Sequence, residues 1–182
     1  MTEPSMTLGS GRAAAVLDPS FVDGLADLPT EEVRRRRDES LAEREFLSYL
    51  RRLVQVRQDI LASEKSRREA GGESEPLVER LTAALTRGTR AEGTRGEAVR
   101  TVLSGQDLEE AQRQADALVP GPSPDDPEGL GDADLEQALT SLGEAERAVS
   151  SQRAAVLRVH DRLQEELKQR YRDNPAEIPT GP

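Results

Sequence analysis

Two sets of five residues with the same spacing constrain the fold of this chain more than any other feature of its sequence. In both sets the members follow one another at steps of four, three, four and four residues. An α-helix turns by about 100° per residue, so each set falls within an arc of roughly 80° on one side of a helix. The first polar set is Arg44, Ser48, Arg51, Gln55 and Asp59. The second polar set is Glu146, Ser150, Arg153, Leu157 and Asp161, so that serine, arginine and aspartate coincide.

The first polar set is expected to lie on a long helix over residues 30–70. Thr30 is the predicted N-cap, and the two acidic residues after it complement the positive end of the helix dipole. Gly71 and Gly72 are expected to end the helix. Its apolar arc consists of Phe46, Leu47, Leu50, Leu53, Val54, Ile60 and Leu61.

The second polar set is expected to lie on another long helix, over residues 132–174. Asp132 or Asp134 is the predicted N-cap. Apolar residues then recur at alternating steps of three and four, which indicates a coiled-coil seam that Gln152 interrupts. The members of this seam are Leu135, Ala138, Leu142, Ala145, Val149, Val156, Val159 and Leu163.

The positions of the two sets predict how the helices pair. The first set precedes the end of its helix by about as many residues as the second set follows the start of its own, so an antiparallel hairpin puts them level with local twofold symmetry. By the 100° rule, the first set lies nearly opposite its apolar arc and the second about a third of a turn from its seam. We therefore predict an all-α fold built on a long antiparallel two-helix coiled-coil hairpin.

The other segments are expected to be less regular. Residues 1–29 form a partly irregular segment with a short apolar patch, either a strap that closes over the helices or a partner-binding element. Residues 71–131 form an insertion of short helices, and residues 175–182 a tail. Within the insertion, short helices are predicted from Pro76 to Gly88, near Val99 to Gly105 and from Asp107 to Leu118, before a Pro-rich linker over residues 120–127.

Composition excludes several classes of protein. Of 182 residues, 35% are hydrophobic, 2% aromatic and 33% charged, which favours long helices packed along narrow seams over a sheet. There is no cysteine, so disulfides and cysteine-ligated metals are excluded. No apolar run approaches membrane-spanning length and no signal-peptide pattern is present, so a cytoplasmic location is expected. The net charge of −10 argues against direct DNA binding and suits a basic protein partner, although it also serves solubility.

The residue types in the two sets suit a symmetric guanine dinucleotide. The planar fork of arginine matches guanine O6 and N7 or a phosphate. An aspartate can accept the N1–H and the exocyclic amine of guanine, a serine lets a ring or phosphate approach closely, and a glutamine can both donate and accept. The alternative is that these side chains only pair with one another on the wet flank of a coiled coil.

The two sets resemble the signature of the RsiG family of actinobacterial anti-sigma factors. That signature is Glu-x-x-x-Ser-x-x-Arg-x-x-x-Gln-x-x-x-Asp, carried once on each of two antiparallel helices. This chain departs from it at Arg44, where the family has glutamate, and at Leu157, where it has glutamine. The resemblance implies that cyclic di-GMP binds to all ten residues of the two sets. It also implies that the chain sequesters a flagellar or sporulation-class (WhiG-like) sigma factor.

Other kinds of site have little support in the sequence. The lone histidine, His160, is expected to be solvated on a charged helix, and without cysteine or a second histidine a zinc site is not expected. No phosphate-binding glycine loop, nucleophile elbow or His–carboxylate constellation is present, so we do not expect an enzyme. The alternatives are a coiled-coil scaffold or adaptor without a nucleotide and, less favoured, an accessory protein of a nucleotide-sensing enzyme.

Overall fold

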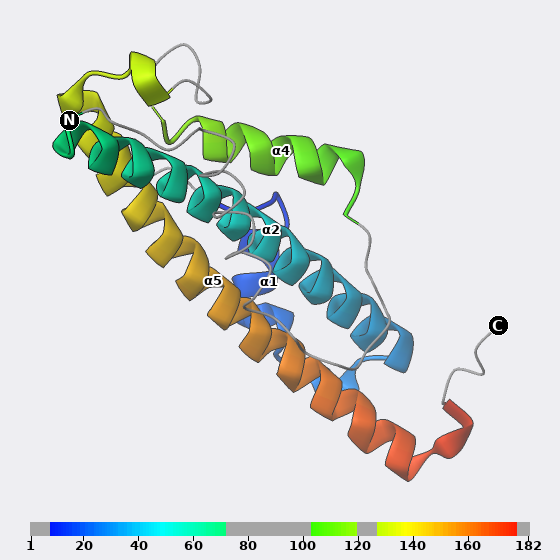
Figure 1. Ribbon diagram of the computed structural model, residues 1–182. Helices are drawn as coiled ribbons and strands as arrows, with labels where there is room; N and C mark the ends of the chain where they lie inside the picture. Colours follow the sequence, from blue (N-terminus) through cyan, green and yellow to red (C-terminus); the bar gives the residue numbers. More distant parts are fainter. Residues whose placement is uncertain (1–7, 72–102, 120–126, 178–182) are drawn as a thin grey trace, which may run out of the picture.

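Two long helices run antiparallel and form the body of the molecule (Figure 1). A computed structural model describes residues 8–71, 103–119 and 127–177. The long helices are α2, Thr30–Glu69, and α5, Asp132–Asp173. The shorter helices are α1, Ala13–Leu17, and α4, Gly105–Asp116, and single 3-10 turns are formed by Pro19–Phe21, Leu25–Asp27, Pro127–Gly129 and Pro175–Glu177. No strand occurs in these described ranges, and the predicted all-α helical hairpin is confirmed.

A heptad seam holds the two long helices together. Every seventh residue of each helix is buried, with at most 2% of its surface exposed, which is the pattern of a two-stranded coiled coil. These residues are Val33, Ser40, Leu47, Val54 and Leu61 on α2, and Leu135, Leu142, Val149, Val156 and Leu163 on α5. Three residues expected in the seams, Leu53, Ile60 and Val159, are only half-buried.

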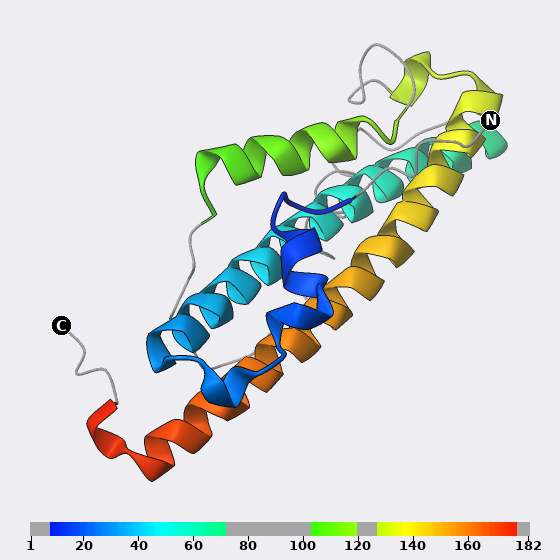
Figure 2. The same cartoon turned by 180° about the vertical axis from the view of Figure 1, so that it is seen from behind.

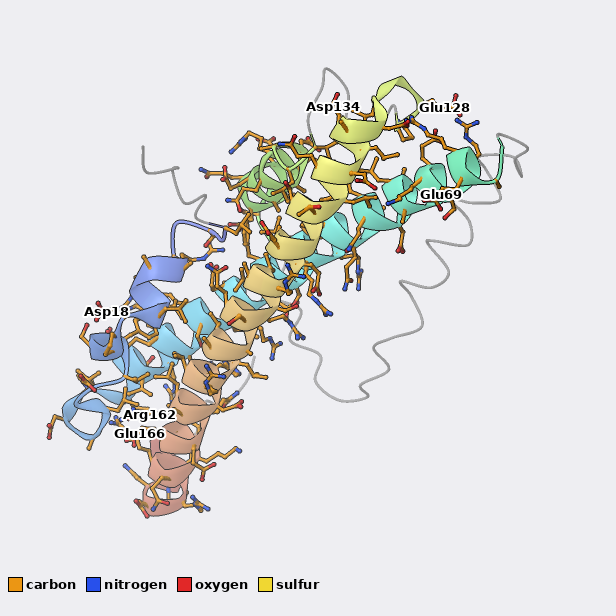
Figure 3. All side chains as sticks on the ribbon, turned by 90° about the vertical axis from the view of Figure 1, so that its left-hand side faces the viewer. Asp18, Glu69, Glu128, Asp134, Arg162 and Glu166 are labelled. Atoms are coloured by element: carbon orange, nitrogen blue, oxygen red, sulfur yellow. The ribbon has the colours of Figure 1, made fainter. Side chains whose placement is uncertain are left out.

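Ion pairs and hydrogen bonds mark both ends of this hairpin. At one end Arg68 Nη1 of α2 lies 2.7 Å from Asp132 Oδ1 of α5. At the other end Arg34 Nε donates to Tyr171 Oη at 2.7 Å. Figure 3 shows the same arrangement, with Glu69 and Asp134 at one end of the pair. The two helices are therefore antiparallel along their full described length.

The N-terminal segment, residues 8–29, lies across both long helices (Figure 2). It is more regular than expected, because it contains α1 and two 3-10 turns. Its apolar side chains join the common core; the buried ones are Leu8, Ala13, Val16, Phe21, Val22 and Leu25. Arg170 of α5 fixes the end of the segment by donating to the carbonyl oxygens of Leu25 and Leu28 at 2.5 and 2.7 Å.

Helix α4 packs along α2 on the side away from α5 (Figure 1). Two alanines one turn apart, Ala111 and Ala115, are fully buried and allow a close approach. The helix begins at Gly105 rather than at Asp107, because Ser104 is its N-cap. The Ser104 side chain accepts from the backbone N–H of Asp107, and the Asp107 side chain accepts from the backbone N–H of Ser104, which forms a capping box. The short helices predicted at residues 76–88 and near 99–102, and the linker at residues 120–126, lie outside the described residues.

The predicted N-caps of the long helices are wrong. Pro29 and Gly131 occupy the N-cap positions, and neither makes a side-chain capping bond. Thr30 is already the first residue of α2, and its hydroxyl accepts a hydrogen bond from Arg170 Nη1 at 3.1 Å. At the other end of α2, Gly71 adopts a left-handed conformation with φ of +83°, as a helix-ending glycine commonly does.

Candidate functional site

The hairpin brings the two polar sets to the same level. Arg51 Nε of the first set donates to Glu146 Oε1 of the second at 2.8 Å. Arg153 Nε of the second set donates to Ser48 Oγ of the first at 2.9 Å. Each arginine thus reaches across to the set on the other helix, which is the relationship that local twofold symmetry predicts.

The first set lies beside α5. The prediction from the apolar arc, which put this set on the far side of α2, is therefore wrong. The arc gave a misleading direction because it faces two neighbours, α5 on one side and the N-terminal segment with α4 on the other. The mean direction of the apolar arc therefore points between these two neighbours. The first set lies on the flank of α2 next to α5. Four members are half-buried there, namely Arg44, Ser48, Arg51 and Gln55, whereas Asp59 is exposed.

Glu146 is the centre of one half of the site. Its Oε1 accepts hydrogen bonds from Arg51 Nε, from Ser150 Oγ at 3.0 Å and from Gln55 Nε2 at 3.4 Å. These bonds lower the pKa of Glu146, and the bond from Arg51 has the largest effect. The carboxylate is thus charged at neutral pH and joins four residues from both helices into one cluster.

The other half of the site has a different charge because Arg44 takes the position equivalent to Glu146. Arg44 Nη2 lies 2.7 Å from Glu45 Oε1 on the same helix. Its backbone carbonyl accepts a hydrogen bond from Ser48 Oγ at 2.8 Å, and Ser48 in turn accepts from Arg153. Ser48, Arg44 and Arg153 therefore form a second cluster next to the first.

The outer members of the sets are not joined to these clusters. Asp59 and Asp161 are exposed, and Leu157 has 37% of its surface exposed. Aspartates at these positions are open to a ligand, and Leu157 offers an apolar surface on which a ring can lie. The site is thus a polar strip on the flank of the hairpin, with clustered residues in the middle and exposed ones outside.

His160 is buried, which contradicts its predicted solvation. Its Nδ1 lies 3.2 Å from Ser40 Oγ, and Ser40 also donates to the carbonyl of Arg37 at 2.7 Å. Burial and then the charge of Arg44 lower the pKa of His160. The heptad register was the signal that could have found this contact, since Ser40 stands seven residues before Leu47 in the seam. Within the described ranges, no group of three or more His, Cys, Asp or Glu side chains could hold a metal.

A hollow at one end of the hairpin is a weaker candidate for a site. It has a volume of about 400 Å³ and is lined mainly by charged residues of α2 and α5. These charges already neutralise one another, because Lys65 Nζ lies 2.7 Å from Glu136 Oε1 and Arg68 pairs with Asp132. The polar strip offers a more distinctive set of donors and acceptors.

Comparison with known proteins supports the resemblance seen in the sequence. Residues 19–85 match the model of a family described as RsiG-like. This range contains the first polar set and all of α2, whereas the second set lies beyond it. No curated protein matches the chain. Among the described residues, none of the helices combines the length and apolar character needed to cross a membrane.

Proposed function

We propose that this RsiG-like chain is an anti-sigma factor that binds cyclic di-GMP on its two polar sets. In the cyclic di-GMP-bound state it sequesters a flagellar or sporulation-class (WhiG-like) sigma factor and so inhibits initiation of transcription. The observation that carries the proposal is the pairing of the two sets across the hairpin, Arg51 with Glu146 and Arg153 with Ser48. The match to the RsiG-like family supports the anti-sigma role.

The symmetry of the polar strip supports a symmetric ligand. The sets run in opposite directions on antiparallel helices, so each presents the same order of serine, arginine and aspartate from its own end. Cyclic di-GMP has two identical halves, each with a guanine and a phosphate. Arginine suits the guanine O6 and N7 edge or the phosphate, and aspartate suits the opposite guanine edge. The proposed ligand contacts are Arg44, Ser48, Arg51, Gln55, Asp59, Glu146, Ser150, Arg153, Leu157 and Asp161.

The charge of the chain supports a protein partner and not DNA. A net charge of −10 opposes a phosphate backbone, whose binding depends on neutralisation by Lys and Arg. A sigma factor carries basic DNA-binding surfaces that an acidic protein can cover. With cyclic di-GMP and a sigma factor as its partners, the chain is proposed to act in the cytoplasm. Nothing in the described part of the chain suggests catalysis.

Nucleotide titration tests the proposal directly. Calorimetry with cyclic di-GMP should give saturable binding to the parent protein and a loss of about ten- to a hundredfold in affinity for Arg51→Ala, because a charged hydrogen bond is worth about 1.5–3 kcal/mol. Arg52→Ala is the matched control, since Arg52 is exposed and lies outside the set. A purified WhiG-like sigma factor should bind the parent in the presence of the nucleotide. Absence of binding by the parent, with and without the sigma factor, would exclude this function.

The alternative is a coiled-coil scaffold whose polar strip serves only the fold. The bonds between Arg51 and Glu146 and between Arg153 and Ser48 favour it, because they already pair the two sets without a ligand. This hypothesis predicts that Arg51→Ala lowers the melting temperature of the protein and that no nucleotide binds. Melting curves measured beside the titration distinguish the two functions.

A further inference from the structure

The start of the N-terminal segment is bonded to α4, although the two are about a hundred residues apart in the sequence (Figure 2). The backbone N–H of Gly9 donates to Gln114 Oε1 at 3.0 Å, and Gln114 Nε2 donates to the carbonyl oxygen of Gly9 at 2.9 Å. Gly9 is buried, so a single side chain of α4 satisfies both backbone polar groups of a residue that has little access to water.

Glu43 bonds the same segment to α2. Its carboxylate is fully buried, and within the described residues both of its hydrogen bonds come from Ser10, one from the backbone N–H at 3.3 Å and one from the hydroxyl. Arg12 brings a positive charge to this carboxylate, with Nε 3.7 Å from Glu43 Oε2. Separating a buried charge from its partners is strongly destabilising, so Glu43 opposes departure of the segment from α2.

Arg12 joins all three elements. While its Nε faces Glu43 of α2, its Nη2 donates to Asp107 Oδ1 of α4 at 3.0 Å. Asp107 lies in the first turn of α4, and Gln114 lies seven residues further along the same helix, so the segment contacts α4 at two levels. Six residues form this three-way contact, which we call the latch: Gly9, Ser10, Arg12, Glu43, Asp107 and Gln114.

We propose that the latch makes the N-terminal segment and α4 dock on α2 as one cooperative unit, so that they open and close together. The inference is independent of the proposed function, because it involves no ligand. If α4 leaves, the segment loses its bonds to Gln114 and Asp107; if the segment leaves, α4 loses the same bonds and Glu43 loses its donors. A molecule that lifts either element therefore also releases the other.

The alternative is that each element is held only by contacts of its own. Helix α4 has the buried alanines 111 and 115 and the ion pair of Asp116 with Arg57, and the segment has buried side chains such as Val16. These contacts survive when the other element leaves, whereas the bonds of the latch do not. Shared contacts couple the two elements, and the coupling can be measured by perturbing one element and observing the other.

Hydrogen exchange on the full-length chain tests the coupling, first by opening α4. Asp116→Ala removes the carboxylate that pairs with Arg57, at the end of α4 and outside the latch. Exchange should rise about tenfold at residues 108–116, because a buried charged donor loses its partner. The proposal expects a rise by the same factor at residues 13–18 of the N-terminal segment, since local opening exposes all the amides of one cooperative unit together.

Two further variants make the first experiment decisive. Glu109→Ala removes an exposed carboxylate from the same helix and should leave exchange of both elements at the parent rate. Ala115→Asp places a charge in the fully buried contact of α4 and should release this helix even if the ion pair of Asp116 is dispensable. Residues 149–163 of α5 should keep the parent rate in all three variants, which shows that the hairpin is intact.

The second experiment opens the segment instead. Val16→Asp places a charge at a residue that is 1% exposed, outside the latch, and should raise exchange at residues 13–18. The proposal expects residues 108–116 of α4 to rise by the same factor. Ala15→Asp is the control, because it adds the same charge to an exposed residue next to Val16 and should leave exchange of α4 unchanged.

Three results would overturn the inference. In the first, one element exchanges faster while the other keeps the parent rate, which shows that they open independently. In the second, α5 exchanges faster by the same factor as both elements, which shows that they have no opening separate from that of the hairpin. In the third, α4 keeps the parent rate in Asp116→Ala, Ala115→Asp and Val16→Asp. None of these results bears on nucleotide binding, so the proposed function is tested separately.

Discussion

Ser40 and His160 face each other inside the seam of the hairpin, with 3.2 Å between Ser40 Oγ and His160 Nδ1. They are a polar pair in a heptad layer whose neighbours, Leu47 and Val156, are apolar and fully buried. Polar pairs at such positions commonly fix the register of a coiled coil. The contact holds α2 and α5 in the alignment that places the two polar sets level.

The Ser40–His160 contact makes the stability of the hairpin depend on pH. Arg37, Arg44 and Asp161 are the charged groups around the ring, and burial together with the arginines lowers the pKa of His160 below 6.5. Below pH 6.5 the unfolded chain therefore binds a proton that the folded chain does not, so the free energy of unfolding falls as pH falls. Denaturant unfolding between pH 7.5 and 5.5 should show this loss.

His160→Leu is the variant that checks the origin of the loss. It should flatten the change in unfolding free energy between pH 7.5 and 5.5, because histidine is the side chain whose ordinary pKa lies in this range and His160 is the one histidine of the sequence. Glu64 cannot contribute in that range, since hydrogen bonds from Arg67 and Arg68 lower its pKa from 4.5 to about 2 and its effect begins only below pH 4.5. An unchanged slope in His160→Leu would assign the pH dependence to another group.

The heptad seam predicts a graded response to truncation of leucines. Leu47 is fully buried between the helices, so Leu47→Ala should cost about 2–5 kcal/mol of unfolding free energy. Leu53 is only half-buried, and Leu53→Ala should cost about 1 kcal/mol. Thermal melts followed by circular dichroism measure both, and the Leu47 variant should melt well below the Leu53 variant. Equal losses would mean that the seam lies elsewhere on α2.

Docking of α4 depends on the ion pair between Arg57 and Asp116. Arg57 is buried, and its Nε has no hydrogen-bond partner, so the carboxylate of Asp116 is an important compensation for its charge. Asp116→Ala should destabilise the docked state by about 1–3 kcal/mol, because it leaves a buried donor unpaired. Hydrogen exchange should then rise at residues 108–116 more than in α5.

Two further variants control the α4 experiment. Glu109→Ala removes an exposed carboxylate from the same helix and should leave exchange unchanged. In the double variant Arg57→Met with Asp116→Ala, the buried charge is gone, and exchange of α4 should return toward that of the parent. If Asp116→Ala exchanges as slowly as the parent, the buried alanines hold α4 without the ion pair.

The sequence allows the hairpin and the level sets to be predicted, because glycine and proline mark the helix ends and the spacing of the sets survives any rotation of the helices. It does not show on which side of α2 the first set lies. That depends on α4 and the N-terminal segment, which contact α2 at Arg57 and Glu43, and the periodicity of α2 alone does not reveal these contacts. The prediction of Thr30 as a cap is wrong for a similar reason, since its hydroxyl accepts a hydrogen bond from Arg170 of the other helix.

The last prediction concerns the coupling between nucleotide and partner. The net charge of −10 opposes a ligand with two negative charges, and Glu146 adds a carboxylate at the strip itself. Basic groups of a sigma factor placed near the strip would offset both effects. Each ligand should therefore tighten the binding of the other by the same factor, because thermodynamic coupling between two sites is reciprocal.

Titration of the sigma factor with and without cyclic di-GMP measures this factor, and titration of the nucleotide with and without the sigma factor should return the same value. A coupling of about 5–150-fold is the usual range. Asp161→Ala offers a matched test, because Asp161 is exposed and its loss should leave the melting temperature unchanged. In that variant nucleotide affinity should fall, and the sigma factor should then bind as weakly as it binds the nucleotide-free parent. Equal affinity of the parent for the sigma factor in both conditions would show that the nucleotide does not control the partner.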